Sequence, residues 1–269
     1  MKKDLIILKL GGSVITKKKS KVPRVDTKNL ERLTTEIAEV YKSRKIKLIL
    51  IHGAGSYGHQ IVKRTGIDKG ITREDQILDF AETQRLQNEL NSIVTKTLIE
   101  KGVPAIPCQA SSHTVMKKGK LERMDINAIK GFLDIGLVPT LYGVPAYDTE
   151  QKCSILSGDV IGPYLAVSLN AKKIIHGSDV DGVFSSDPKK DPKAKLIPMI
   201  SYDNFNEVKK MLSGSTAVDV TGGMAKKIQE LFSLTESGIE SEIVNATKPG
   251  IIKRVLSGEK GLGTLIKWK

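Results

Sequence analysis

The sequence predicts an α/β fold, a three-layer αβα sandwich with a mostly parallel central sheet. Strand-like and helix-like patterns alternate along the chain, and such alternation favours parallel strands joined by crossover helices. The first strand pattern, DLIILKL at residues 4–10, is almost continuously apolar, which is typical of a buried strand. No solenoid period, low-complexity tract or obvious linker interrupts the 269 residues, so we expect a single domain.

Periodicity and turn residues place the elements of the first half. Apolar residues at 30, 33, 37 and 40 have the spacing of one helix face, and Asp26 or Thr27 is a suitable N-cap. A longer helix opens with Thr72-x-x-Asp75, which resembles a capping box, and closes at Gly102. The expected elements are strands at 4–10, 45–51, 103–108 and 137–143, helices at 27–44, 73–100 and 126–136, and a hairpin at 116–124 with Gly119 in its turn.

The second half continues the same alternation. Gly238 ends one helical pattern, and Pro249 is a suitable first residue for another. The expected elements are helices at 159–170, 202–212, 223–238 and 248–258, and strands at 171–176 and 241–246, before residues 263–269 close the chain.

The chain carries a formal net charge of +13, from 43 basic and 30 acidic residues. A basic protein binds nucleic acids or small anions, or simply has a lysine-rich surface. Much of the excess is dispersed lysine, and only 4% of the residues are aromatic, which argues against a stacking platform for single-stranded nucleic acid. We therefore expect no nucleic-acid partner.

Cysteines, histidines and apolar runs bear on compartment and metal binding. The longest apolar runs have the length of strands, so we expect neither a membrane span nor a secretory leader. Cys108 and Cys153 form no C-x-x-C motif and fit a reducing cytoplasm, where we expect the protein to work. Four scattered histidines do not suggest a metal cluster, so we expect no protein-built metal site.

Glycine-rich loops follow the first two strands. In KLGGS at 9–13, the backbone N–H groups either form a tight turn or face an anion that Lys9 also reaches. The second loop, HGAGSYGH at 52–59, matches G-x-G-x-x-G, but a dinucleotide site also needs a following strand that ends in an acidic residue. Residues 73–100 form one helical pattern instead, which argues against a dinucleotide. Because ligands bind beyond the carboxyl ends of parallel strands, two facing loops predict a site for two phosphorylated ligands, or for two ends of one.

Five segments together resemble the amino acid kinase superfamily: KLGGS, HGAGSYGH, LSGD, SDVDGVFSSDP and TGGMAKK, in this order. The resemblance covers essentially the whole chain, and the order and spacing are more specific than any single motif. It implies transfer of the γ-phosphoryl group of ATP to a carboxylate, carbamate or phosphate, with Mg²⁺ arriving on the ATP. It also implies a homodimer, and an acceptor-binding lobe at 1–170 beside a nucleotide-binding lobe at 171–269.

A histidine after the third glycine of the second loop, His59, is most similar to the isopentenyl phosphate kinases of that superfamily. The resemblance then implies phosphorylation of isopentenyl phosphate to isopentenyl diphosphate, a step of isoprenoid precursor synthesis, so the small-molecule partner would be a phosphate monoester. Kinases of a phosphonate such as fosfomycin, of an amino-acid carboxylate or of a nucleoside monophosphate stay open as alternatives. A non-catalytic anion or nucleic-acid binder stays open from another class.

The resemblance assigns roles to residues of these motifs. Lys9 would bridge the transferred phosphoryl group and the donor phosphates, Lys18 would stabilise the transferred group, and Lys227 would hold the donor phosphates. His59 would grip the acceptor phosphate, and Asp159 would orient the lysines. The implied ATP-binding residues are Lys9, Gly11, Gly12, Ser13, Gly55, Asp179, Asp181, Gly182, Phe184, Gly222, Gly223 and Lys227, and the implied acceptor-binding residues are Ala54, Gly55, Gly58, His59 and Gly158.

Simpler structural roles stay open for three of these residues. Lys18 would be an ordinary solvated charge in its run of three lysines, His59 would cap the next helix, and Asp159 would be a plain N-cap. The acceptor's apolar tail also needs a small dry pocket, although core packing explains the available apolar side chains equally well. The candidates on the helix at 73–100 are Ile77, Phe80 and Leu86.

Overall fold

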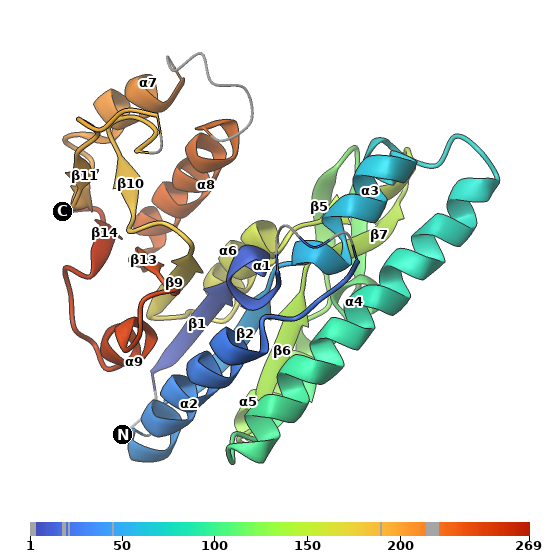
Figure 1. Cartoon of the computed structure of the whole chain (residues 1–269), viewed down its shortest axis with the longest axis horizontal. Coiled ribbons are helices and arrows are strands. Elements are labelled where there is room, and N and C mark those ends of the chain that lie inside the picture. The colour runs from blue at the N-terminus through green and yellow to red at the C-terminus, as the bar shows by residue number, and fades with distance from the viewer. Residues whose placement is uncertain (1–3, 18–19, 21, 45, 189, 214–220) are drawn as a thin grey trace.

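The structure is a computed structural model that describes residues 4–17, 20, 22–44, 46–188, 190–213 and 221–269. Within these residues, an eight-stranded sheet crosses the molecule in the order β12-β14-β13-β9-β1-β2-β6-β3 (Figure 1). Its pairings are parallel except that β13 and β14 run antiparallel, so the predicted mostly parallel sheet is confirmed. The strands are β1 (Leu5–Leu10), β2 (Lys47–His52), β3 (Ala105–Pro107), β6 (Val138–Tyr142), β9 (Lys173–Ser178), β12 (Met199–Ile200), β13 (Glu240–Asn245) and β14 (Gly263–Ile266).

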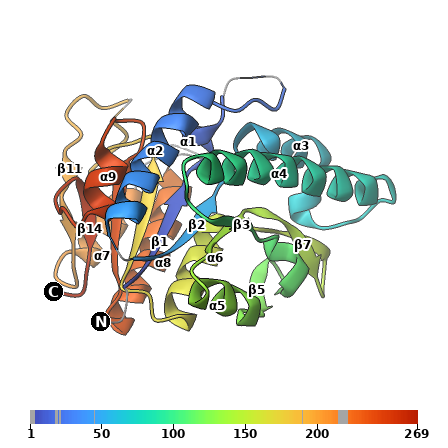
Figure 2. The same ribbon diagram turned by 90° about the horizontal axis from the view of Figure 1, so that it is seen from below.

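Helices cover both faces of this sheet, which completes the three predicted layers (Figure 2). One core lies beneath α2 (Thr27–Ser43), α4 (Asp75–Glu100) and α9 (Ile251–Leu256). The other lies beneath α5 (Asn127–Asp134), α6 (Gly158–Ser168), α7 (Phe205–Ser213) and α8 (Thr221–Ser233). Successive strand residues point to opposite faces, so Ile6 and Leu8 enter the first core and Ile7 the second. Lys9, the next odd position, therefore projects on the side of α6 and α8.

A second, four-stranded sheet lies beside the N-terminal end of α4. Its order is β5-β4-β7-β8, from β4 (Thr114–Lys117), β5 (Lys120–Met124), β7 (Val144–Asp148) and β8 (Lys152–Leu156). The buried carboxylate of Asp148 joins its two hairpins, because it accepts hydrogen bonds from the backbone N–H of Gly119 and from the hydroxyl of Ser154. A further pair consists of β10 (Val183–Phe184) and β11 (Leu196–Ile197).

Most predicted elements are present, with three corrections. The capping box of α4 is wrong, because the side chain of Gln76, not Asp75, accepts hydrogen bonds from the N–H groups of Thr72 and Arg73. The helix expected from Pro249 begins only at Ile251, and the strand expected at 103–108 is confined to Ala105–Pro107. The predicted hairpin is confirmed, with Gly119 at φ +75°.

Short elements escaped the sequence pattern. These are the β7–β8 hairpin, the brief strands β10, β11 and β12, and two helices that follow the glycine loops, α1 (Gly12–Ile15) and α3 (His59–Thr65). The two helices are too short to show a hydrophobic period, which needs a window of about 11–18 residues, and β10, β11 and β12 have only two residues each. No described helix is long and apolar enough to cross a bilayer. Cys108 and Cys153 are buried free thiols.

Candidate active site

The two glycine loops pack backbone against backbone at the carboxyl ends of β1 and β2. A Cβ on Gly12 would lie 2.2 Å from the backbone nitrogen of Gly55, and one on Gly53 would lie 2.6 Å from that of Gly12. Gly55 also has φ +53°, a conformation that disfavours a side chain. The hydroxyl of Thr16 accepts a hydrogen bond from the Ser56 N–H and holds the loops together. The glycines are therefore required first by this close approach.

Two lysines and a histidine surround the carboxylate of Asp159. Lys9 Nζ lies 2.8 Å and Lys227 Nζ 3.7 Å from the same oxygen, Oδ1. His176 Nδ1 lies 3.5 Å from that oxygen, because β9 pairs with β1 in a register that sets His176 beside Lys9. Ser157 caps α6 by accepting a hydrogen bond from the Asp159 N–H, which places Asp159 in the first turn of the helix.

Burial and charge act against each other in this cluster. Burial raises the pKa of Asp159, but the contact with His176 and the charges of Lys9 and Lys227 outweigh it and hold the pKa well below the usual range. Burial lowers the pKa of His176 to about 4, so this imidazole is neutral at pH 7. Burial and the nearby Lys9 lower the pKa of Lys227. Two cations are thus confined beside a single carboxylate.

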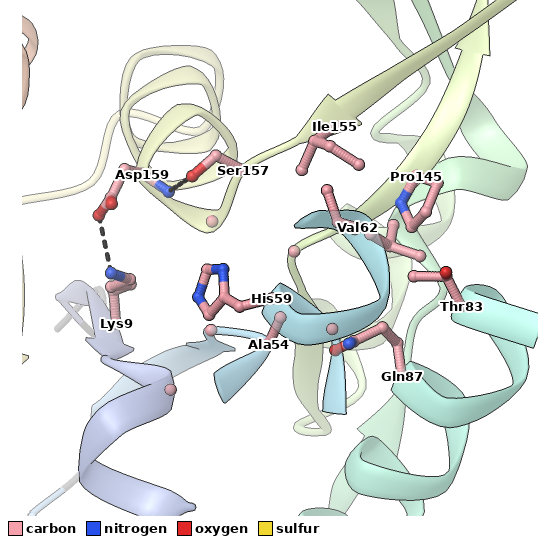
Figure 3. Close-up of a pocket in the computed structure, with 16 residues that line it drawn as sticks. Lys9, Ala54, His59, Val62, Thr83, Gln87, Pro145, Ile155, Ser157 and Asp159 are labelled. Atoms are coloured by element: carbon pink, nitrogen blue, oxygen red, sulfur yellow. Dashed lines mark hydrogen bonds and ion pairs between the residues drawn. The ribbon is translucent and has the colours of Figure 1, made fainter. Parts of the chain in front are cut away.

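A cavity of about 150 Å³ opens between Lys9 and helix α4 (Figure 3). Lys9 and Asp159 lie at one end of it, and His59 lies next to them. The other end is lined by Val62, Thr83, Gln87, Pro145 and Ile155. We call it the acceptor cavity. Its two ends suit a ligand with an anionic head and an apolar body.

A second cavity, of about 350 Å³, is lined by the same lysine. We call it the donor cavity. Of the residues that the structure describes, three line both cavities, namely Lys9, Gly12 and His59. The rest of its lining is Gly11, Ser13, Gly55, Ser56, Gln60, Ser178, Asp179 and Lys227. Two ligands bound in the two cavities would therefore meet at Lys9.

Comparison with known proteins identifies the family. A sequence profile described as the Amino acid kinase family matches residues 4–245. The chain belongs to the amino acid kinase family. A curated relative named isopentenyl phosphate kinase, from Methanothermobacter thermautotrophicus, is 41% identical, and the match spans 98% of this chain and 100% of the relative. Another with the same name, from Methanocaldococcus jannaschii, is 37% identical, and the match spans 95% of this chain and 96% of the relative. A crystal structure of an isopentenyl phosphate kinase superposes with a TM-score of 0.84 at 39% identity, covering 98% of this chain and 100% of that one.

The fold brings together many residues that the family resemblance singled out. Ala54, Gly58, His59 and Gly158 line the acceptor cavity, while Gly55 lines the donor cavity. The predicted nucleotide residues in the donor cavity are Lys9, Gly11, Gly12, Ser13, Gly55, Asp179 and Lys227. The predicted residues Asp181, Gly182 and Phe184 do not line either cavity, and the surroundings of Gly222 and Gly223 lie outside what the structure describes.

Those outlying residues have other surroundings. Asp181 forms an ion pair with Lys248, at 2.6 Å, and accepts a hydrogen bond from Asn245. Gly182 has φ +152°, and a Cβ there would lie 2.5 Å from the hydroxyl of Thr264. Phe184 is half-buried in β10, and Gly222 and Gly223 lie in the first turn of α8.

The structure decides whether His59 and Asp159 are simple helix caps. Gly58 occupies the cap position of α3 and His59 is its first residue, so the histidine is not the cap. Ser157 caps α6, so Asp159 is not a plain N-cap. Lys18 lies outside the described residues. Its neighbour Lys17 pairs with Asp26 at 2.7 Å.

Sequence reasoning missed three buried polar side chains at the site. His176 was left without a partner, yet it contacts Asp159. Thr83 and Gln87 on α4 line the acceptor cavity in place of the suggested apolar residues. Of those, Ile77 is 58% exposed and Leu86 packs against the core beneath α2. Thr83 and Gln87 are four residues apart, so both lie on one face of the predicted helix. Two polar residues with this spacing were the only indication in the sequence that this face is polar.

Proposed function

We propose that the protein transfers the γ-phosphoryl group of ATP to isopentenyl phosphate and releases isopentenyl diphosphate and ADP. The observation that carries this proposal is the meeting of the donor and acceptor cavities at Lys9, Gly12 and His59. Relatives that match nearly the whole chain at 37–41% identity have the name of this activity.

The reaction needs charge control more than covalent chemistry. An oxygen of the acceptor phosphate forms the new P–O bond, while the bond between the γ-phosphorus and the β-phosphate oxygen breaks. The electron pair of that bond leaves with ADP, and no proton has to move if the acceptor reacts as the dianion. The protein must therefore align two polyanions and offset their repulsion.

We assign these tasks to the residues around Asp159. Lys9 would contact the transferred group from between the cavities, and Lys227 would hold the donor phosphates. Asp159 would orient both ammonium groups through its Oδ1 atom. Lys18 would stabilise the transferred group. Each preorganised charge of this kind contributes about 10²–10³ in rate.

The acceptor cavity favours a phosphate monoester with a hydrocarbon tail. His59 and the N–H groups of the glycine loop would grip the oxygens that are not transferred, since an imidazole adds no fixed charge. The charged residues Lys9 and Asp159 both lie at the head end, whereas an amino-acid acceptor needs charged partners for its own carboxylate and amine. Val62, Pro145 and Ile155 would pack on the tail.

The donor cavity fits a magnesium nucleotide. Mg²⁺ is bound largely by phosphate oxygens and water. Asp179 lines the donor cavity near Lys227, and its carboxylate oxygens are ligands of the kind that Mg²⁺ accepts. Among the described residues, no group of three or more His, Cys, Asp or Glu is arranged as a metal cage. The ion would shield the phosphate charges of ATP.

We also keep the division into lobes. The described residues that line the acceptor cavity all fall within 1–170, and the donor cavity adds Ser178, Asp179 and Lys227 from 171–269. We therefore assign the acceptor to the first lobe and the nucleotide to the second. The homodimer predicted from the family resemblance is tested by sedimentation of the purified protein.

Replacing His59 tests the acceptor assignment. In His59→Ala, we expect transfer to isopentenyl phosphate to fall about 10²–10³-fold, and ATP affinity measured by calorimetry to fall much less, because His59 only borders the donor cavity. His113→Ala is the control, because His113 lies outside both cavities. Wild-type turnover by His59→Ala would remove the assignment.

An acceptor panel tests the substrate class. Wild-type protein with labelled ATP is offered isopentenyl phosphate, fosfomycin, glutamate and uridine monophosphate at equal concentrations. We expect the highest kcat/KM with isopentenyl phosphate, because only its tail matches the apolar end of the acceptor cavity. Faster phosphorylation of another acceptor would reassign the enzyme within the family.

A further inference from the structure

Helix α4 presents a polar stripe to the interior of the protein. Five buried polar residues recur on one face of it, at positions 76, 83, 87, 91 and 95. Both polar atoms of Gln76 are hydrogen bonded, since it accepts from Thr72 and Arg73 and donates to the carbonyl of Thr65. Thr83, Asn91 and Thr95 each form at least one hydrogen bond as well.

Gln87 is the exception on this stripe. Its side chain is 1% exposed, and neither Oε1 nor Nε2 has a hydrogen-bond partner among the described residues. It lines the acceptor cavity at the end away from Lys9 and Asp159 (Figure 3). A Cβ on Gly58 would lie 2.4 Å from Gln87 Nε2, so the absence of a side chain there leaves room for the amide.

An amide buried without partners lowers stability unless a ligand satisfies it. A pocket that holds only hydrocarbon would be served better by leucine or methionine at this position. Gln87 offers two N–H donors and one acceptor oxygen to whatever occupies the tail end of the cavity. Thr83, one turn earlier, donates its hydroxyl hydrogen to the carbonyl of Asp79, which leaves its oxygen able to accept a hydrogen bond.

We propose that Gln87 determines acceptor specificity by hydrogen bonding a hydroxyl group on the tail of the acceptor. The site would then take short, branched alkyl monophosphates that carry a tail hydroxyl, in addition to isopentenyl phosphate. The chemical step is unchanged, because the hydroxyl is remote from the phosphate that accepts the γ-phosphoryl group. This inference rests on the proposed function.

The test compares two acceptors of matched shape in wild type and Gln87→Met. The probes are isopentenyl phosphate and 3-hydroxy-3-methylbutyl phosphate, which is the same molecule with water added across its double bond. Methionine keeps the length and unbranched form of glutamine but removes the amide. We expect Gln87→Met to lower kcat/KM for the hydroxylated acceptor about tenfold relative to kcat/KM for isopentenyl phosphate. An equal change for both acceptors would overturn the proposal, since it would indicate a bridging water or packing alone.

Gln76→Met is the matched control on the same helix. Gln76 is a buried glutamine whose amide oxygen and nitrogen both form hydrogen bonds, and it does not line the acceptor cavity. Without ligand, we expect Gln87→Met to raise the melting temperature by about 2–4 °C and Gln76→Met to lower it. The ratio of kcat/KM values for the two acceptors should stay at the wild-type value in Gln76→Met. Loss of stability in both variants would contradict an unpaired amide at Gln87.

Failure of the proposed function gives a different result. If wild-type protein phosphorylates neither acceptor, the assignment of isopentenyl phosphate as the acceptor is itself wrong. If it phosphorylates isopentenyl phosphate and the ratio is insensitive to Gln87→Met, only the role of Gln87 falls. Thermal shifts of the ATP-free protein with each acceptor give the same comparison without turnover.

Discussion

Lysines line cavities at both ends of the parallel strands in the eight-stranded sheet. We call the side where these strands begin the beginning edge, and the side where they end the ending edge. At the beginning edge, a cavity of about 520 Å³ has Lys172 paired with Asp4 at 2.5 Å and Lys47 paired with Asp134 at 2.7 Å. At the ending edge, Lys9 and Lys227 share one carboxylate oxygen. Their side chains are 10% and 16% exposed, against 68% for Lys172.

The difference teaches that size does not mark the reactive edge. The beginning edge has the larger cavity, but each of its paired lysines has a carboxylate of its own in contact with water, and such surface pairs contribute little. At the ending edge, two buried ammonium groups repel each other, as the lowered pKa of Lys227 through burial and the charge of Lys9 indicates. A bound polyanion would relieve that repulsion. Two buried like charges therefore mark the reactive edge of the sheet better than cavity volume does.

The largest expected effect comes from removing one lysine at each edge. In Lys9→Met, kcat/KM should fall about 10²–10³-fold, because the charge between the cavities is lost. In Lys172→Met, kcat/KM should stay within about twofold, since that pair is exposed. Steady-state kinetics on both variants measures this, with melting curves to verify folding. Similar losses in both would break the comparison between the two edges.

The ending edge was largely predictable from the sequence, because motifs there follow elements with clear periods. Lys9 lies one residue before the end of an apolar strand, and Lys227 lies at the middle of a helix with a glycine pair in its first turn. His176 was not predictable, since its place beside Lys9 depends on the strand order, which brings β9 next to β1. Gln87 was not predictable either, because the helix period gives a face but not the cavity that the face lines.

Replacing a glycine in the glycine loops at the ending edge should have a smaller effect than removing Lys9. In Gly12→Ala, the new methyl group would meet backbone of Gly55, which cannot rotate away, so the free energy of unfolding should fall by about 1–3 kcal/mol or more. Gly131→Ala is the control, because Gly131 is exposed within α5 and a Cβ there meets nothing within 4 Å. It should stabilise the protein by about 0.5–1 kcal/mol through helix propensity.

Urea denaturation measures both glycine variants. Opposite signs are expected, because the same added methyl group enters a backbone contact in one case and solvent in the other. If Gly12→Ala were as stable as wild type, the loops would not be held in the close approach that frames the two cavities. Its kcat/KM should fall as well, since both cavities are lined by Gly12.

The last effect is spread over a range of pH and concerns the two fully buried histidines at the ending edge. His52 stacks on Tyr142, and its Nδ1–H donates to the carbonyl of Gly53 while Asn91 Nδ2 lies 3.1 Å from Nε2. Burial lowers the pKa of His52 to about 4, against the opposing effect of the Gly53 hydrogen bond, and burial lowers the pKa of His176 to the same value. Both side chains are therefore neutral in the folded protein when the unfolded chain, with a histidine pKa of about 6.5, begins to take up protons.

The sign of the pH dependence follows from that difference. Between pH 6.5 and 4, the unfolded state binds more protons than the folded state, so the free energy of unfolding falls as the pH falls. Each histidine contributes at most about 1.4 kcal/mol per pH unit. The carboxylate of Asp159 protonates below this window, since its pKa is held low despite burial by the contact with His176 and by the two lysines. Urea melts in high salt, which screens the net charge of +13, should show this slope, and His52→Asn should make it shallower. A free energy of unfolding that does not change between pH 6.5 and 4 would mean that these imidazoles reach water or a partner that stabilises their charged form. The interior at the ending edge would then be more accessible to water than the burial of its lysines indicates.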